Sequence, residues 1–341
     1  MTTPVDGRSP LLSTIGERGL IQRIRERFPT PAGSLHIGIG DDAAVTAGVR
    51  GELDVLTTDA LVEGVHFDLR FSSFADVGYK ALAVNVSDIA AMGATPRLAL
   101  LSLILPDRLT IADVDGLLDG FSRMAKEAGV VLAGGNITRT PGPLAIDVTA
   151  VGHVRPRRVL TRGGGNAGDI LYVTGEIGAA AAGLGVLRAS AQAAHDAEVA
   201  ALIERHCRPA PRLRVGALLG RTRTATACMD LSDGLADAVS QLAKASGSGA
   251  EIDAAALPVP AAARRWFESQ GQDPVRAALA GGDDYELLFA VSPRRGGRLR
   301  TVIRQARGVR ITRIGELTAS PAILVKRDGA TEPMPGGFSH F

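Results

Sequence analysis

Apolar positions along this chain switch repeatedly between the period of a helix and that of a strand. Around residues 20–28 they recur three and four positions apart, after Thr14 and Glu17, which fit a capping box, and before Pro29, which ends the pattern. Residues 98–105 form a continuous apolar run of strand length. The first half is thus predicted to hold helices at 14–28, 75–92 and 110–128, and strands at 53–58, 98–105, 130–133 and 144–154.

The same alternation continues beyond a basic, glycine-rich stretch at 155–166, RPRRVLTRGGGN. The second half is predicted to hold strands at 169–174, 225–231, 251–257, 285–291, 309–317 and 322–325, and helices at 179–187, 198–207, from 211 onward and at 233–245. Interleaved strands and helices are typical of an α/β or α+β fold. We place the boundary in the glycine-rich stretch and expect two domains, 1–155 and 156–341.

Composition narrows the class of protein. The formal net charge is +2, which argues against a polybasic nucleic-acid binder. No apolar run approaches the roughly 20 residues of a membrane span, and the N-terminus lacks the apolar core of a secretory signal. The 2 cysteines are too few for a disulfide framework or a four-thiolate zinc site. We expect a soluble, cytoplasmic protein that binds neither nucleic acid nor membrane.

The candidate chemistry lies in acidic groups at the ends of predicted elements. These groups are Gly40-Asp41-Asp42, Thr57-Thr58-Asp59, Asn85-Val86-Ser87-Asp88, Asp230-Leu231-Ser232-Asp233 and Gly282-Asp283-Asp284. Most follow an apolar stretch and have no neighbouring lysine or arginine, so a bound cation would explain them, and hard oxygen ligands suit Mg²⁺. Asp230 and Asp233, three apart on a first helical turn, would share an ion. The alternative is that each aspartate is a helix cap or turn residue.

Glycine-rich segments and a few cations add weaker signals. Gly38-Ile39-Gly40, Gly134-Gly135-Asn136 and Gly163-Gly164-Gly165 would each bring backbone N–H groups near phosphate, or form plain turns. None fits the P-loop or the dinucleotide fingerprint. Arg162 is a candidate phosphate contact or a solvated linker residue, and His66 a candidate ligand or a structural histidine.

Taken together, these motifs resemble a known family. The segment from Asp88 to Pro96 fits the pattern D-x4-G-A-x-P of the ATP-binding superfamily of aminoimidazole ribonucleotide synthetase. Within it, seven segments in order are similar to the thiamine-monophosphate kinases: GIGDDAAV (38–45), TTDALVEGVHF (57–67), YKALAVNVSDIAAMGA (79–94), LTRGGGNAGD (160–169), MDLSDGL (229–235), GGDDYEL (281–287) and GFSHF (337–341). The resemblance covers nearly the whole chain.

The resemblance implies an activity, a fold and a set of site residues. The activity is ATP-dependent phosphorylation of thiamine monophosphate to thiamine diphosphate, with several Mg²⁺ ions. The fold has an N-terminal sheet that pairs across a homodimer and a C-terminal α/β domain that closes the active site. The implied metal ligands are Asp42, Thr57, Thr58, Asp59, Asp88, Asn136, Asp230 and Asp233, of which Asp88, Asp230 and Asp233 are expected to be catalytic. Implied nucleotide contacts are Gly135, Asn136, Arg162 and Ser232, and implied substrate contacts are His66, Asp283 and Phe338.

Two departures from the family pattern stand out. Asn136 stands where the family has aspartate, so one metal ligand lacks its charge, and Asp283 stands where it has glutamate, one methylene longer.

Other functions stay open as alternatives. Selenophosphate synthetase would show a reactive residue near the N-terminus, yet the first cysteine is Cys207, and a hydrogenase-maturation factor would end in a cysteine-bearing tail. A nucleotide-binding protein without turnover is the alternative that Asn136 favours.

Overall fold

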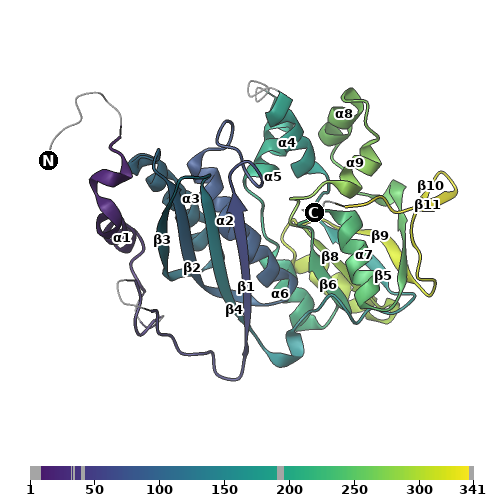
Figure 1. Cartoon of the computed structure of the whole chain (residues 1–341). Helices are drawn as coiled ribbons and strands as arrows, with labels where there is room; N and C mark the ends of the chain where they lie inside the picture. Colours follow the sequence, from purple (N-terminus) through teal and green to yellow (C-terminus); the bar gives the residue numbers. More distant parts are fainter. Residues whose placement is uncertain (1–8, 32, 34, 40–42, 190–195, 338–341) are drawn as a thin grey trace. The chain divides into compact units, whose positions relative to one another are not determined.

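The computed structural model describes residues 9–31, 33, 35–39, 43–189 and 196–337. The chain divides into two compact units (Figure 1). Unit 1 comprises Met1–Val86 and Pro96–His153, and unit 2 comprises Ser87–Thr95 and Val154–Phe341. The two domains expected from the sequence, 1–155 and 156–341, with their separate roles, stay a prediction.

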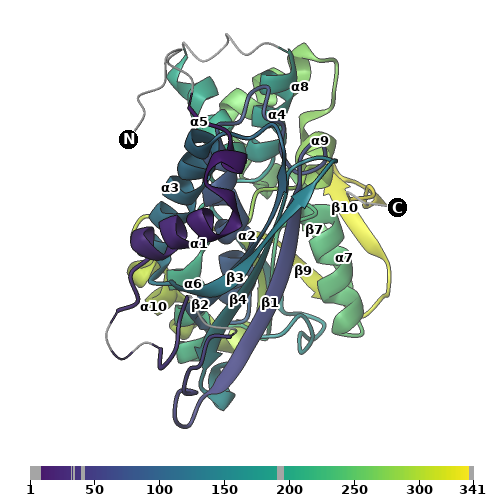
Figure 2. The same cartoon turned by 60° about the vertical axis from the view of Figure 1, so that its left-hand side comes forward.

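Unit 1 is a four-stranded sheet with helices packed on it. The elements are α1 (Gly16–Arg27), β1 (Leu53–Val62), α2 (Phe74–Ala91, which ends in unit 2), β2 (Thr95–Pro106), α3 (Ile111–Ala128), β3 (Val131–Thr140) and β4 (Ala145–Val154). The strand order is β1-β4-β2-β3, and β2 and β3 are parallel. Figures 1 and 2 show α2 and α3 against one face of this sheet. Side chains of α3 such as Leu117 and Phe121 are buried there.

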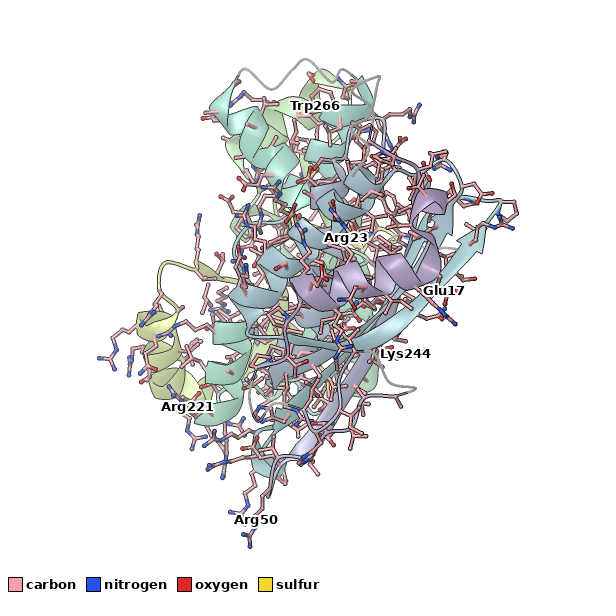
Figure 3. The ribbon with its side chains drawn as sticks, turned by 90° about the vertical axis from the view of Figure 1, so that its left-hand side faces the viewer. Glu17, Arg23, Arg50, Arg221, Lys244 and Trp266 are labelled. Carbon is pink, nitrogen blue, oxygen red and sulfur yellow. The ribbon has the colours of Figure 1, made fainter. Side chains whose placement is uncertain are left out.

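Local sequence signals explain the boundaries of α3 better than those of α1. Thr110 and Asp113 form a reciprocal capping box at the start of α3, and Gly129 ends it in the left-handed conformation, with φ of 70°. The capping box expected at Thr14 and Glu17 is wrong, because the Thr14 hydroxyl donates to the Leu11 carbonyl, 2.7 Å away, and α1 begins at Gly16. An ion pair between Arg23 and Asp115 joins α1 to α3. Arg23 is labelled on α1 in Figure 3.

Unit 2 is built on a seven-stranded sheet in the order β11-β10-β7-β9-β5-β8-β6. Its strands are β5 (Ile170–Thr174), β6 (Ala227–Asp230), β7 (Gly249–Asp253), β8 (Leu287–Val291), β9 (Ile311–Thr318), β10 (Ile323–Arg327) and β11 (Ala330–Pro333). Its helices are α4 (Ala179–Ala189), α5 (Ala197–Cys207), α6 (Leu213–Thr222), α7 (Leu235–Ala245), α8 (Ala261–Ser269), α9 (Pro274–Ala280) and α10 (Gly296–Gln305). The pairs are antiparallel except β7–β10, which is parallel.

The sheet of unit 2 carries a buried core on each face. Met229 on β6 packs into a cluster with residues of α4, α7 and α9, whereas its neighbour Cys228 joins a cluster with residues of α6 and α10. Successive residues of a strand point to opposite faces, so a sheet covered on both sides needs strands that are apolar throughout. All five residues of β8 are buried, as this requires.

The alternation of helices and strands predicted from the sequence is confirmed. The helices α8, α9 and α10 were not predicted, and β3 runs on to Thr140 instead of ending at Ala133. Asp233 does not open a helix, because α7 begins at Leu235 after Gly234. Within the described part of the chain, no helix is both long and apolar enough to span a membrane.

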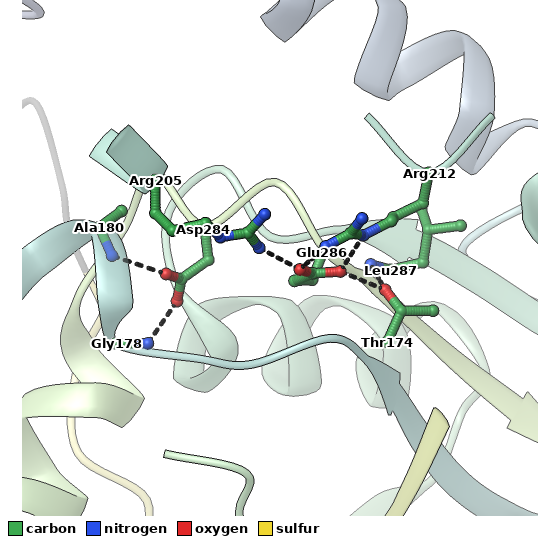
Figure 4. A network of polar contacts seen from close by, with 8 residues as sticks. All are labelled: Thr174, Gly178, Ala180, Arg205, Arg212, Asp284, Glu286 and Leu287. Carbon is green, nitrogen blue, oxygen red and sulfur yellow. Dashed lines mark hydrogen bonds and ion pairs between the residues drawn. The ribbon is translucent and has the colours of Figure 1, made fainter. Parts of the chain in front are cut away.

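A carboxylate far away in the sequence caps α4. Asp284 accepts hydrogen bonds from the backbone N–H groups of Gly178 (2.6 Å) and Ala180 (3.1 Å), as Figure 4 shows. A carboxylate at this position satisfies N–H groups that have no partner inside the helix and interacts favourably with its dipole. Asp284 is only 1% exposed, however, and its burial raises the pKa of the carboxyl to about 7 against the effect of these bonds.

Helices α4 and α5 approach each other unusually closely at Gly183. A Cβ atom there would lie 2.1 Å from the carbonyl oxygen of Leu202 on α5. We therefore expect Gly183→Ala to lower the free energy of unfolding by about 1–3 kcal/mol, despite the better helix propensity of alanine. Gly297→Ala on α10, where only the end of Arg300 is near, is the matched control and should be neutral or stabilising. Chemical denaturation of both variants tests this, and an equally stable Gly183→Ala would contradict the close approach.

The raised pKa of Asp284 predicts a specific pH dependence. Between about pH 4, the unfolded value, and about pH 7 the folded chain holds a proton that the unfolded chain releases. The contribution of this group to stability is therefore complete below about pH 4 and is lost as the pH rises through 7. Asp284→Asn removes the ionisation. The free energy of unfolding of the wild type minus that of the variant should fall across this range, by at most about 1.4 kcal/mol per pH unit.

Asp273, the N-cap of α9, supplies the control for this measurement. Burial acts to raise its pKa, but the hydrogen bond and charge of Arg327 hold the pKa below the ordinary value. Above about pH 5 Asp273 is thus ionised in both states, and the difference between the wild type and Asp273→Asn should be flat from there to pH 7. An equally flat curve for Asp284→Asn would show that its two backbone hydrogen bonds keep that carboxylate ionised.

Candidate active site

The site residues expected from the sequence divide between the two units. Thr57, Thr58, Asp59, His66, Gly135 and Asn136 lie in unit 1, and Asp88, Arg162, Asp230, Ser232, Asp233 and Asp283 lie in unit 2. Asp42 and Phe338 lie outside the described residues.

In unit 1, the three residues Thr57, Thr58 and Asp59 are consecutive on β1. Strand geometry puts Thr57 and Asp59 on one face and Thr58 on the other. The Thr58 hydroxyl donates to the carbonyl of Val148 on β4 (3.2 Å), so part of its role is to join the two strands.

Gly135 and Asn136 lie within β3, so the plain-turn reading of Gly134-Gly135-Asn136 is wrong. Gly135 pairs with Leu101 of β2, and a Cβ at Gly135 would lie 1.8 Å from the Leu101 carbonyl oxygen. This close approach alone requires glycine there. Since β1 and β3 are the two edge strands of the sheet, the structure does not bring Asn136 and Asp59 of one chain together.

His66 lies in the turn that follows β1. Its Nδ1 accepts a hydrogen bond from the backbone N–H of Val62 (3.1 Å), and its carbonyl accepts one from the buried Lys80 ammonium (3.3 Å). A ring nitrogen that accepts is unprotonated, so the neutral imidazole carries its proton on Nε2. The partly exposed ring is thereby fixed with a donor at Nε2.

In unit 2, a hydrogen bond joins the motif around Asp88 to the motif around Asp230. The Ser87 hydroxyl donates to Oδ2 of Asp230 over 2.7 Å, and Asp230, the last residue of β6, is 4% exposed. Asp88 follows Ser87 on α2. Cys228, two residues before Asp230 on β6, is fully buried. Burial raises the pKa of its thiol, and the nearby Asp230 charge raises it further, so Cys228 is not a nucleophile.

The segments 230–234 and 281–286 are paired backbone to backbone. Asp283 and Tyr285 donate their N–H groups to the carbonyls of Ser232 (2.8 Å) and Leu231 (3.0 Å), and Leu231 donates to Glu286 (2.9 Å). Asp283 and Tyr285 both have left-handed backbone angles, with φ of 69° and 48°. Such conformations are strained for residues other than glycine and persist where the surroundings enforce them.

Glycines make this pairing possible. A Cβ at Gly282 would lie 2.6 Å from the Ser232 carbonyl oxygen, and one at Gly234, whose φ is 94°, would lie 2.7 Å from the Gly281 carbonyl oxygen. Gly234 of MDLSDGL and Gly282 of GGDDYEL are thus needed because the backbones of the two motifs touch.

A buried ionic network anchors the paired segments. Glu286 has no exposed surface and binds the guanidinium groups of Arg205 and Arg212 and the hydroxyl of Thr174 (2.6 Å), as Figure 4 shows. Burial acts to raise the pKa of Glu286, but the hydrogen bond and charge of Arg212, with the charge of Arg205, hold the pKa below its ordinary value. No local sequence pattern marks these ion pairs, because the partners are 74 and 81 positions apart.

Arg162 and Gly337 both lie beside α7. Arg162 donates to the Gln241 side-chain oxygen (2.6 Å), and Gln241 in turn donates to Asp237 one turn earlier. A Cβ at Gly337 would lie 2.7 Å from the Asp237 Cβ, so the residue before Phe338 is placed beside the start of α7.

The expected ligands carry the type of atom that Mg²⁺ prefers. All the expected ligands offer oxygen, and Asp230 ends a strand with its carboxylate already oriented by Ser87. Among the described residues, no three histidine, cysteine or acidic side chains lie close enough together to form a metal site. The ligand assignments stay predictions.

Two family models match the chain: AIR synthase related protein, N-terminal domain, over residues 40–154, and AIR synthase related protein, C-terminal domain, over residues 166–326. The thiamine-monophosphate kinase of Escherichia coli (strain K12) is 40% identical over 330 residues, which are 96% of this chain and 98% of that protein.

Solved structures agree with these sequence matches. The crystal structure of thiamine-monophosphate kinase from Stenotrophomonas maltophilia K279a has a TM-score of 0.81 at 36% identity and covers 91% of this chain and 96% of that chain. A structure described as AaThiL complexed with AMPPCP and TMP has a TM-score of 0.76 at 34% identity and covers 99% and 100%. The family predicted from the motifs and the mixed α/β fold are confirmed: this chain belongs to the thiamine-monophosphate kinase family.

Proposed function

We propose that this protein transfers the γ-phosphoryl group of ATP to the phosphate of thiamine monophosphate, forming thiamine diphosphate and ADP. The observation that carries the proposal is the similarity to thiamine-monophosphate kinases, which extends over every acidic motif. In addition, three of these motifs are bonded to one another in unit 2. The Ser87–Asp230 hydrogen bond joins two of them, and the backbone pairing of 230–234 with 281–286 joins the third. A relative was solved with AMPPCP, a non-hydrolysable ATP analogue, and TMP.

The proposed chemistry needs positioning and charge neutralisation more than a base. The attacking phosphate oxygen is already ionised near neutral pH, whereas a free primary hydroxyl would need a general base. Two polyanions must meet, so the carboxylates Asp42, Asp59, Asp88, Asp230 and Asp233, with Thr57, Thr58 and Asn136, are proposed to hold Mg²⁺. When bound, the metal neutralises phosphate charge. Arg162 and Ser232 are proposed to contact ATP, and His66, Asp283 and Phe338 the acceptor.

The residues of unit 1 support a homodimer. Leu56 on β1 is 69% exposed and Leu100 on β2 is 41% exposed, which is unusual for large apolar side chains in the middle of strands. Leu56 lies on the face of β1 that carries Thr58, away from the buried Leu61. We propose that this face pairs with that of a second copy, as the family resemblance implies, in a protein that works in the cytoplasm.

The choice of acceptor gives the first test. ADP release from ATP should depend on thiamine monophosphate and on Mg²⁺, and free thiamine at the same concentration should release at least about 100-fold less, the factor attributed to a missing general base. A coupled ADP assay with both acceptors and with excess chelator measures this. Comparable turnover of thiamine would contradict the proposed mechanism.

A charge on the exposed strand face should separate the subunits. Leu56→Glu places a carboxylate on a surface proposed to be desolvated on association, so light scattering should shift from about twice the 35.3 kDa chain mass to a single chain mass. Asp54→Asn, two residues earlier on the same face, removes a carboxylate instead of adding one; it is the control and should stay dimeric. A wild type that scatters as a single chain at micromolar concentration would contradict the dimer.

A further inference from the structure

The last turn of α5 touches the GGDDYEL segment through two consecutive side chains. Arg205 pairs with Glu286, and Nδ1 of His206 lies 3.4 Å from Oδ2 of Asp283. The His206 side chain is 4% exposed and that of Asp283 is 31% exposed. The Asp283 carboxylate therefore faces a buried imidazole on one side and solvent on the other.

The backbone leaves Asp283 few ways to orient its carboxylate. Its left-handed φ of 69° and its N–H bond to Ser232 fix the direction of the Cα–Cβ bond. Only two side-chain torsions then remain, one fewer than for the glutamate of the family pattern. A single contact of the carboxylate is enough to select among the remaining rotamers.

The imidazole that makes this contact is held on a rigid element. Helix α5 packs on α4 with Gly183 against the Leu202 carbonyl, and Arg205, adjacent to His206, is tied to the fully buried Glu286. A side chain supported in this way is suited to holding a neighbouring group in one geometry.

We propose that His206 is a positioning residue that holds the Asp283 carboxylate toward the phosphate acceptor. This rests on the proposed function, in which Asp283 contacts thiamine monophosphate. The acceptor carries a cationic thiazolium ring and an amino group, and both are suitable partners for a carboxylate. His206 itself touches no reacting atom, so its loss should weaken acceptor binding and leave ATP binding unchanged.

Two substitutions at position 206 separate the positioning nitrogen from the bulk of the ring. His206→Leu fills similar volume without a ring nitrogen, whereas His206→Asn keeps a polar side chain close to the position of Nδ1. We expect His206→Leu to raise the KM for thiamine monophosphate about tenfold, the effect of one lost polar interaction. Its KM for ATP and its kcat should stay within about twofold, and His206→Asn should recover most of the acceptor affinity.

A double-mutant cycle shows whether the effect passes through Asp283. In an Asp283→Asn background, His206→Leu should cause little further change in the KM for thiamine monophosphate. Additive effects, equal changes in both KM values, or an unchanged KM in an active His206→Leu would overturn the proposal. If His206→Leu does not fold, His206→Phe keeps a ring without the nitrogen and takes its place.

The contact between His206 and Asp283 can also be tested without an activity assay. Thermal unfolding of the wild type, the two single variants and the double variant gives a second cycle, in which contacting residues show a coupling and independent residues do not. A wild type that releases no ADP with thiamine monophosphate refutes the proposed function. In that case a lack of coupling in unfolding also overturns the His206–Asp283 pairing, whereas a coupling upholds the pairing alone.

Discussion

The burial of one carboxylate is the constraint on which the candidate site in unit 2 depends. Glu286 has no exposed surface, and an isolated charge in such a place costs far more than any single contact returns. Two arginines and the Thr174 hydroxyl compensate it, and they come from α5, the start of α6 and the end of β5. Because these elements must all be in place, Glu286 fixes where the segment 281–286 leaves the sheet.

From this fixed point the geometry of the site follows through the backbone. The ladder between β6 and β8 ends at Asp230 and Leu287, and the hydrogen bonds of 231–232 with 283–286 extend it. Gly234 and Gly282 allow the two segments to touch. The left-handed backbone angles of Asp283 and Tyr285 set the directions of these two side chains. The outcome is that Asp230, Ser232 and Asp283 are presented from two segments held together by backbone hydrogen bonds.

The two departures from the family pattern have different structural settings. Asn136 lies on an edge strand of unit 1, and β3 needs Gly135 for its close approach to β2 whatever occupies position 136. Loss of a carboxylate there changes the charge of the proposed metal site and not the strand. Asp283, in contrast, lies in a strained segment next to a buried histidine, so its shorter side chain has a neighbour able to hold it.

The sequence by itself determined the alternation of helices and strands, the extent of α3 and the family, because periodicity and ordered motifs are local signals. It also singled out Asp88, Asp230 and Asp283 through their glycine and acidic context. Only the tertiary structure showed that Ser87 donates a hydrogen bond to Asp230, and that Gly134-Gly135-Asn136 is extended.

The network of Glu286, Arg205 and Arg212, and the contact of His206 with Asp283, were equally invisible in the sequence. These partners are more than 70 residues apart, and nothing near either one marks the other. The pairing of a buried charge is decided by which elements the fold packs together, and that choice follows from the burial of apolar surface across the whole unit.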